Sequence, residues 1–466
     1  MISSSNAATE KNFEAAPYVR PLVVDVDFLL HHRDLLADVL FSAIRYPTAA
    51  TPGILLAFAR GRIAAHRHLA QSNLIDPARL TYNSDVTTYL LQQLGAGRQI
   101  LIASARYDDR LVSAVAQHLG LSHALPAAQD EGNNIFDPLA VPSNYGERYD
   151  YLGAAATQPP LGAARVELPA AALDATGFPG WRVWIRLLRV HQYSKNALVM
   201  VPLVTAHQFN LLSACQAVLA AMAFSFAASS AYIVNDLLDV TADRAHPTKR
   251  HRPIAQRAVT SKQALGAMAG LFAAALGIGA TLSLAFLATL LLYFALTTAY
   301  SLRLKRIAIA DVVTLAGLYT IRVVAGAIAI SVSMSEWLFA FSLFIFMSLA
   351  LVKRYVELTG RQSGERLMAR DYQRDDLAMV AVFAAASGFN AVVIFTLYIS
   401  SDTVRSLYSH PQLLWIGCPV LMYWFGRVMM LAQRGLIDDD PVIFALKDRA
   451  SWVSLGMIGI ILFVAM

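Results

Sequence analysis

Three aspartates and an asparagine lie just past a long apolar stretch of the chain. The apolar run, residues 214–234, is long enough to cross a bilayer as a helix. If that helix continues into the acids, Asn235, Asp239 and Asp243 share one face, because residues four apart stack along a helix. Carboxylates so aligned repel one another unless a cation lies between them, and hard oxygen ligands suit Mg²⁺. We therefore expect Asn235, Asp236, Asp239 and Asp243, called the acidic motif below, to form a magnesium site.

Basic side chains follow the acidic motif directly. They are of the kind that binds phosphate oxygens: His246, Lys249, Arg250 and Arg252. Acids for a metal followed by cations for phosphate indicate a diphosphate site. The alternative is a solvated loop between membrane helices, positive because it faces the cytoplasm. That alternative explains the cations but not the spacing of the acids.

The composition is that of an integral membrane protein. The chain has 466 residues, of which only 15% are charged, and its mean hydropathy is +0.48, which is too apolar for an ordinary soluble protein. The net charge of +6 is too small to indicate nucleic acid, so we expect no nucleic-acid partner. We attribute the positive excess to cytoplasmic loops and phosphate binding.

Elements that could position the motif are apolar runs of spanning length, about nine in number. They lie at residues 196–212, 214–234, 263–283, 285–301, 310–331, 336–352, 378–399, 412–431 and 450–466. Every second connection between them is rich in lysine and arginine, whereas the alternate connections carry almost none. This alternation predicts a multi-pass membrane protein with the N-terminal part and the acidic motif in the cytoplasm and the C-terminus outside. The membrane that we expect is the bacterial inner membrane.

Further charged residues lie near the predicted inner ends of these runs. They include Lys305, Arg322, Lys353, Arg354 and the acid Asp311, while Lys195 and the neighbouring Asn196, at the start of the first run, are expected to contact substrate. An acid at the start of a membrane helix is costly to bury, which favours a functional role. For Arg322, inside a predicted span, the alternative is a packing role paired with an acid.

The chain before the membrane region alternates strands and helices, which predicts a small parallel α/β domain. Asp25 and Asp27 follow the first strand and Ser104 ends a later one, and this arrangement resembles haloacid-dehalogenase (HAD)-type phosphatases. The family's glycine after the second aspartate is Phe28 here, and its lysine and metal-binding acids are not found. We therefore predict a disordered tail over 1–20, an inactive HAD-like domain over 21–158, a linker over 159–180 and the membrane domain over 181–466. The alternative is an active phosphatase, which would remove a phosphate group from the product of the membrane domain.

The acidic motif and its surroundings resemble the UbiA superfamily of intramembrane prenyltransferases. Within it, the similarity is greater to decaprenyl-phosphate phosphoribosyltransferases. It is carried by the run from Asp243 to Ala255, by Lys195-Asn196, by Tyr300 to Asp311 and by Lys353 to Glu357. The superfamily's second motif has two acids four apart, but Leu315 stands in the second place here. This departure fits the phosphoribosyl branch better than the aromatic prenyltransferases.

The resemblance implies an all-α, UbiA-like membrane domain and a chemistry. Phosphoribosyl diphosphate would be the donor and a polyprenyl phosphate the acceptor, with Mg²⁺ as cofactor. Asp236, Asp239, Asp243 and Asp311 would be catalytic, and the cations named above would bind the two anionic substrates. The product would supply lipid-linked arabinose for the cell envelope or for a nodulation factor. The alternatives are prenyl transfer to an aromatic acceptor, and a membrane transporter or lipid-binding protein. The chain could also form a homo-oligomer.

Overall fold

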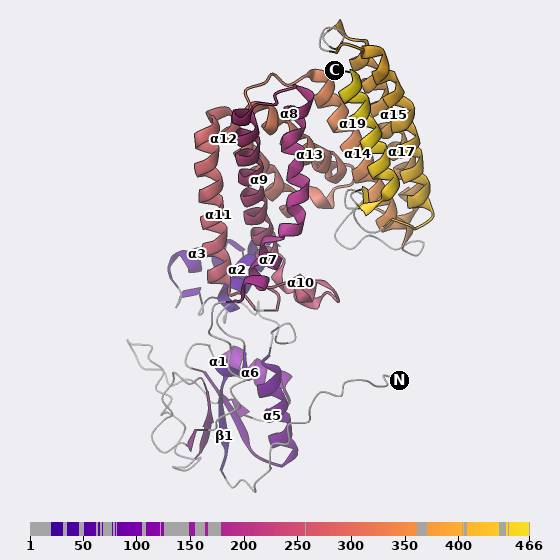
Figure 1. Ribbon diagram of the computed structural model, residues 1–466. Helices are drawn as coiled ribbons and strands as arrows, with labels where there is room; N and C mark the ends of the chain where they lie inside the picture. The colour runs from indigo at the N-terminus through magenta and orange to yellow at the C-terminus, as the bar shows by residue number, and fades with distance from the viewer. Residues whose placement is uncertain are drawn as a thin grey trace. The chain divides into compact units, whose positions relative to one another are not determined.

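The computed structural model of the protein consists of a small α/β part and a large helical part (Figure 1). It describes residues 20–30, 35–45, 51–61, 64–65, 68, 77, 80, 82–104, 109–121, 123–124, 149–153, 164–165, 179–256, 258–360, 371–402, 404, 408–437, 444–445 and 447–465. Almost all of the predicted tail, most of the predicted linker and the side chain of Asp27 lie outside the described residues. The chain divides into two compact units. Unit 1 comprises Met1–Trp184 with Asp236–Gln263, and unit 2 comprises Ile185–Asn235 with Ala264–Met466.

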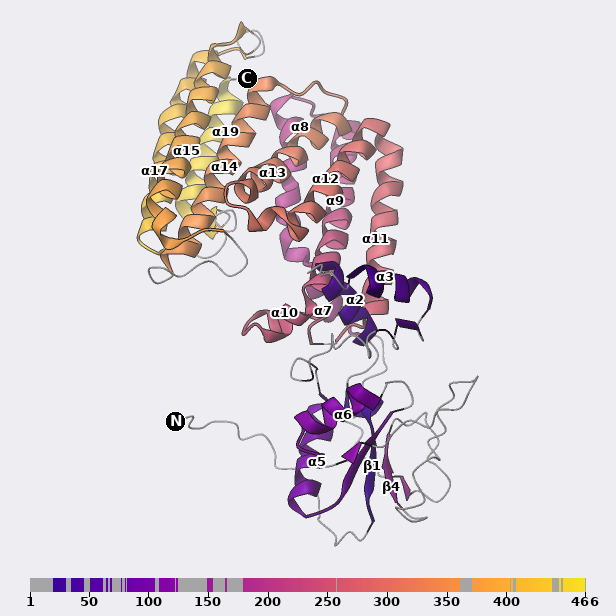
Figure 2. The same cartoon turned by 180° about the vertical axis from the view of Figure 1, so that it is seen from behind.

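Unit 1 contains a parallel sheet, as the alternating pattern predicts (Figure 2). Its five strands stand in the order β3-β2-β1-β4-β5. Their bounds are β1 Leu22–Asp25, β2 Ile100–Ala103, β3 His123–Ala124, β4 Asp150–Leu152 and β5 Ala164–Arg165. The central strand β1 pairs in parallel with both β2 and β4. Asp25 therefore ends the middle strand of the sheet.

The three central strands, β2, β1 and β4, are buried, and successive residues along each strand point to opposite sides. Leu22 and Val24 face one core, which is covered by α5 (Ser84–Gly95) and α6 (Asp109–His118). Val23 belongs to a second cluster with Leu101 and Tyr151. The apolar runs of these strands follow from this two-sided burial.

The other helices of unit 1 fall into two groups: three follow strand β1 in the sequence, and two lie in or just after the acidic motif. They are α1 Val26–Leu29, α2 Leu35–Arg45, α3 Thr51–Ala59, α10 Val240–Ala245 and the 3₁₀ turn η6 Lys249–His251. Helix α7 (Trp181–Leu188) leads from unit 1 into unit 2. Within unit 1, α2 packs against α10.

Unit 2 is all-helical. Its elements are η5 Val190–Met200, α8 Val201–Thr205, α9 Leu211–Leu238, α11 Ser261–Leu282, α12 Leu284–Leu302, η7 Leu304–Arg306, α13 Ala310–Ala329, α14 Glu336–Thr359, η8 Arg374–Asp376, α15 Leu377–Ser400, η9 Pro411–Ile416, α17 Gly417–Gln433 and α19 Arg449–Ala465. Helices α9 and α11 extend at one end into unit 1. The predicted fold class, a helical membrane domain preceded by a small α/β domain, is confirmed.

The number of spans differs from the prediction of about nine. Seven helices among the described residues are long and apolar enough to cross a membrane, and α19 adds a shorter apolar helix of 17 residues. The stretch 196–212 does not form the one helix predicted for it. It is a 3₁₀ segment, η5, followed by the short α8, whose first turn contains Pro202. Proline has no backbone N–H to donate to the preceding turn, so it is tolerated in the first turn of a helix and a new helix starts there.

Helix α13 is the centre of unit 2, because it packs against η5, α8, α12 and α14. At Gly326 the backbone of η5 lies close against α13: a Cβ there would lie 2.0 Å from the carbonyl oxygen of Val199. Small residues permit such backbone contact between membrane helices. The glycine therefore fixes how deeply η5 sits against α13.

Candidate active site

The acidic motif spans the end of one helix and the start of another. Asn235 and Asp236 lie on the last turn of α9, which ends at Leu238. The chain then turns at Asp239, whose φ of −97° and ψ of 7° are not helical, and α10 carries Asp243. The predicted single helical face is therefore wrong for Asp239, because the helix is interrupted at that residue. Asp236 and Asp243 are instead the two acids that come together.

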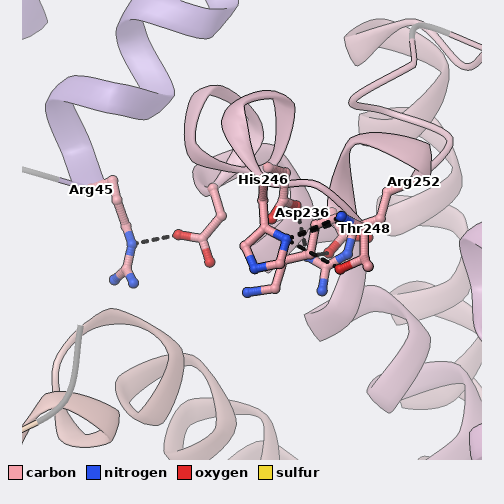
Figure 3. A network of polar contacts seen from close by, with 8 residues as sticks. Arg45, Asp236, His246, Thr248 and Arg252 are labelled. Carbon is pink, nitrogen blue, oxygen red and sulfur yellow. Dashed lines mark hydrogen bonds and ion pairs between the residues drawn. The ribbon is translucent and has the colours of Figure 1, made fainter. Parts of the chain in front are cut away.

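One guanidinium nitrogen bridges these two acids. Nη1 of Arg252 lies 3.1 Å from Oδ1 of Asp236 and 2.6 Å from Oδ2 of Asp243 (Figure 3). Both aspartates are 3% exposed. Burial raises the pKa of Asp243 above its ordinary value, and the attraction of Arg252 only partly offsets this effect. The pair therefore needs a cation between its oxygens, and Arg252 supplies one.

Asp239 has a different partner, which the sequence analysis missed. Its Oδ1 lies 2.7 Å from Nε of Arg45, at the end of α2 (Figure 3). The Arg45 side chain is 3% exposed. The contact joins two parts of the sequence that are separated by 194 positions. No local pattern around Arg45 distinguishes it from other arginines at the ends of amphipathic helices.

The cations that follow the acidic motif divide into two sets. Arg252 is engaged with the acids, whereas Lys249 and Arg250 are exposed on η6. Nδ1 of His246 accepts hydrogen bonds from the backbone N–H groups of Thr248 (3.3 Å) and Lys249 (3.4 Å). His246 thus stabilises the turn that presents the two exposed cations.

The acids around Arg252 bear on a magnesium site. Asp236 and Asp243 both direct an oxygen at the same guanidinium nitrogen, and two carboxylates with water and phosphate oxygens are a ligand set of the kind that suits Mg²⁺. No group of three or more potential ligand side chains is close enough to hold a metal, among the residues described. A three-aspartate site would therefore need Asp239 to leave Arg45.

Unit 2 contains a buried arginine in the middle of α13. Arg322 is 5% exposed and donates to Oδ1 of Asn196 (2.9 Å), to the hydroxyl of Tyr293 (2.8 Å) and to the carbonyl of Leu318. Its guanidinium also lies over the rings of Tyr293 and Tyr319. We call these residues the Arg322 network.

The hydrogen bonds of Arg322 go to an amide, a hydroxyl and a backbone carbonyl, and the predicted alternative of pairing with an acid is not seen among the described residues. Asn196 holds the arginine from the side, because its amide nitrogen donates to Oγ of Ser225 (2.9 Å) and leaves Oδ1 as the acceptor. A charged side chain inside a membrane bundle is costly to bury, and these hydrogen bonds offset part of that cost.

Asp311, the acid of the predicted second motif, lies in a different cluster of unit 2. It is fully buried, and its Oδ2 lies 2.9 Å from Nε of Arg354, which also pairs with Glu357. The hydroxyl of Tyr372 donates to Oδ1 of Asp311 (2.7 Å) and accepts from the N–H of Ile309 (2.8 Å). Ile309 has a positive φ of 65°, which is strained for a β-branched residue. Tyr372 thus secures the strained entry to α13, and Asp311 and Arg354 neutralise each other.

The remaining predicted contacts are lysines of unit 2. Nζ of Lys195 lies 5.8 Å from the ring centroid of Tyr319, which is also a neighbour of Arg322. Lys195 therefore lies beside the Arg322 network. Lys305 on η7 and Lys353 on α14 are half-buried.

The fold and the site together define a class of protein, namely a multi-pass membrane protein with buried acids and arginines. The UbiA prenyltransferase family matches residues 197–447, which is more than half of the chain. The chain therefore belongs to the UbiA prenyltransferase family, and it is a transferase.

Three relatives extend this assignment. The chain is 31% identical over 460 residues to the uncharacterized protein y4nM of Sinorhizobium fredii, covering 93% of this chain and 88% of that protein. It is 36% identical over 281 residues to the decaprenyl-phosphate phosphoribosyltransferase of Mycolicibacterium smegmatis, covering 57% of this chain and 86% of that protein. It is 32% identical over 276 residues to the nodulation protein NoeC of Azorhizobium caulinodans, covering 57% of this chain and 88% of that protein. The similarity to y4nM includes the α/β part, whereas the other two match little more than half of the chain.

Among solved structures, a UbiA homologue from Archaeoglobus fulgidus bound to GPP and Mg²⁺ resembles 60% of this chain and 100% of its own, with 15% identity and a TM-score of 0.45.

Proposed function

We propose that the protein transfers a 5-phosphoribosyl group from phosphoribosyl diphosphate to a polyprenyl phosphate, and that the reaction depends on Mg²⁺. The bond from the ribose C1 to the diphosphate oxygen breaks and a bond from C1 to an oxygen of the lipid phosphate forms. The products are inorganic diphosphate and a polyprenyl-phosphate phosphoribose. The lipid phosphate is already anionic, so the attack needs no strong general base.

The acids and cations of unit 1 would bind the donor. Asp236, Asp239 and Asp243 are the proposed metal ligands, assisted by Asn235 at the end of α9. The bound ion would neutralise charge on the leaving diphosphate. Exposed Lys249 and Arg250, on the turn secured by His246, would bind the diphosphate or the 5-phosphate. Arg252, released from the acids when the ion binds, would add a further donor.

The Arg322 network would bind the lipid phosphate. Arg322 is held by three acceptors and has no acidic partner among the described residues. Lys195 would add a second positive charge beside it. Asn196, predicted as a substrate contact, would instead position the guanidinium.

The single observation that favours the phosphoribosyl donor over a prenyl diphosphate is the state of the second motif. Leu315, at the place of the superfamily's second acid, packs in an apolar cluster with Val312 and Tyr355. Asp311 is neutralised by Arg354. A second metal ion would therefore lack both ligands of this motif, because one position is a leucine and the acid at the other is paired with an arginine. This argues against an aromatic prenyltransferase. The ion pair between Asp311 and Arg354 also favours a positioning role for these two residues, both of which were predicted as functional. For Lys305 and Lys353 we propose peripheral contacts with phosphate.

The orientation and the wider role follow from the same proposal. The basic connections favour a bacterial inner membrane location with unit 1 in the cytoplasm, where phosphoribosyl diphosphate is made. A lipid-linked phosphoribose would supply arabinose for glycan arabinosylation, and the similarity to NoeC supports a nodulation factor as one such glycan.

Incubation of membranes with radiolabelled phosphoribosyl diphosphate, and separately with a radiolabelled prenyl diphosphate, tests the choice of donor. We expect label to enter the lipid fraction only from the ribosyl donor, only with Mg²⁺, and not with Asp243→Asn. Label transferred from the prenyl diphosphate to an aromatic acceptor would overturn the proposal in favour of prenyl transfer.

A further inference from the structure

The segment that carries Arg45 is an insertion in the α/β domain. The chain leaves the domain after α1 and returns at an antiparallel bridge between Leu30 and Tyr82. Next to this bridge, the N–H of Asn83 donates to the carbonyl oxygen of Leu29 (2.9 Å). Helices α2 and α3 lie between these two ends and pack against each other. The insertion is therefore tied at its base to the end of the sheet's central strand.

The far part of the insertion meets the acidic motif. Helix α2 packs against α10, and its last residue, Arg45, pairs through Nε with Asp239. The Arg45 side chain is buried at 3% exposure and that of Asp239 at 14%. Placing a guanidinium at such burial costs several kcal/mol unless it is paired with an anion, so the contact is specific.

Two arginines pair with the acids of the motif. Arg252 is shared between Asp236 and Asp243, and Arg45 pairs with Asp239. A guanidinium binds carboxylate and phosphate oxygens with the same planar set of donors, so it can exchange one for the other without moving far.

In the α/β domain, the aspartate at the end of the central strand is hydrogen-bonded to a tyrosine. The hydroxyl of Tyr151 donates to Oδ2 of Asp25 (3.2 Å), the carboxylate that would attack phosphate in an active HAD-type enzyme. An attacking carboxylate needs its oxygen open to the phosphorus atom. The contact supports a domain whose role lies in its insertion instead of in hydrolysis.

We propose that Arg45 is an exchangeable cation of the diphosphate site, supplied by the α/β domain. In the structure it holds Asp239. When a divalent ion and a diphosphate bind, Asp239 is released to the ion and Arg45 donates to a diphosphate oxygen. The proposal rests on the proposed function in one respect, namely that Asp239 is a metal ligand. Arg45 is accordingly a substrate-binding residue, and its insertion couples the α/β domain to donor binding.

Calorimetric titration of the full-length protein in detergent tests this with two probes, Mg²⁺ alone and inorganic diphosphate at saturating Mg²⁺. Arg45→Gln removes a cation that competes for Asp239, so Mg²⁺ alone should bind about tenfold more tightly. The same variant lacks a phosphate donor, so diphosphate should bind about tenfold more weakly. Arg45→Lys should shift both affinities in the same directions by smaller factors, and it serves if Arg45→Gln does not fold. Arg60→Gln, an exposed arginine just after α3, is the matched control and should change neither.

Opposite shifts of the two affinities support the proposal. A role in holding Asp239 for the metal would weaken both affinities, and unchanged affinities would make the ion pair incidental; either result overturns the proposal. In an Asp239→Asn background, Arg45→Gln should leave Mg²⁺ affinity unchanged, and a tenfold gain there would also contradict it. Neither probe contains ribose, so a failure of ribosyl transfer, which would sink the proposed function, leaves this result decided independently.

Discussion

A methyl group added at Gly326 should disable the Arg322 network without touching it. The new Cβ would lie 2.0 Å from the carbonyl oxygen of Val199 and 3.1 Å from Cδ of Pro202. Carbon and oxygen normally approach no closer than about 3.3 Å, so η5 and α13 must separate by roughly 1.3 Å. Arg322 lies one turn before Gly326 on α13 and Asn196 one turn before Val199 on η5. The same separation therefore lengthens the 2.9 Å bond between Arg322 and Asn196 beyond hydrogen-bonding distance.

The expected cost has two parts. Forcing the two segments apart costs about 1–3 kcal/mol, as overpacking generally does. Losing a hydrogen bond to a charged group adds about 1.5–3 kcal/mol. Thermal unfolding of Gly326→Ala in detergent should therefore occur at a lower temperature. The KM for the polyprenyl phosphate should rise on the order of tenfold or more, because the guanidinium loses its lateral support.

Gly317→Ala is the control, since Gly317 lies on the same helix with open space at its Cβ position. It should retain wild-type stability and KM. Wild-type behaviour of Gly326→Ala would refute the close packing of η5 on α13, and a large loss in Gly317→Ala would refute the assignment of the effect to that contact.

Three further predictions concern other contacts. Arg322→Gln should raise the KM for the lipid phosphate at least tenfold with little change in the affinity for inorganic diphosphate, whereas an equal loss of both would contradict a lipid-phosphate site. Tyr372→Phe removes the hydrogen bond that the hydroxyl donates to Asp311 and the one it accepts from the N–H of Ile309, so unfolding in denaturant should show a loss of about 1–3 kcal/mol; an unchanged midpoint would argue against this support of α13. Asp448→Ala removes the carboxylate that accepts from the N–H of Ser451 at the start of α19 and from Arg427, and should cost about 1 kcal/mol. Burial acts to raise the pKa of Asp448, but the hydrogen bonds from Arg427 and Ser451 together outweigh burial. The net result is a pKa below the ordinary value of 3.8. The stabilisation by Asp448 is therefore complete above pH 3.8 and is lost as the pH falls through the lowered pKa, so a difference between variant and wild type that vanished near pH 5 would contradict it.

Apolar length and the period of the pattern were sufficient to predict the long helices and the parallel sheet. The exception is 196–212, where composition alone could not reveal that the chain forms a 3₁₀ segment and then restarts at Pro202. Hydropathy is blind to backbone hydrogen bonding, and a proline near a helix start is compatible with either outcome.

The residues of the site could be selected from the sequence, but their pairing could not. Spacing placed Asp239 with Asn235 and Asp243 on one helical face, whereas a turn at Asp239 exchanges it for Asp236. Arg45 and Tyr372 escaped notice because their partners, Asp239 and Asp311, are distant in sequence. Such contacts depend on how segments return to one another, and no local pattern encodes that.

The most direct test of the proposed reaction is mass spectrometry of the lipids formed by the purified protein from isotopically labelled phosphoribosyl diphosphate, a polyprenyl phosphate and Mg²⁺. We predict a lipid heavier than the acceptor by one labelled phosphoribosyl group, with equimolar release of inorganic diphosphate. Neither product should form after chelation of the metal or with Asp236→Asn, although that variant should still insert into membranes. An unchanged polyprenyl phosphate in the presence of the wild-type protein, or full turnover by Asp236→Asn, would contradict the account.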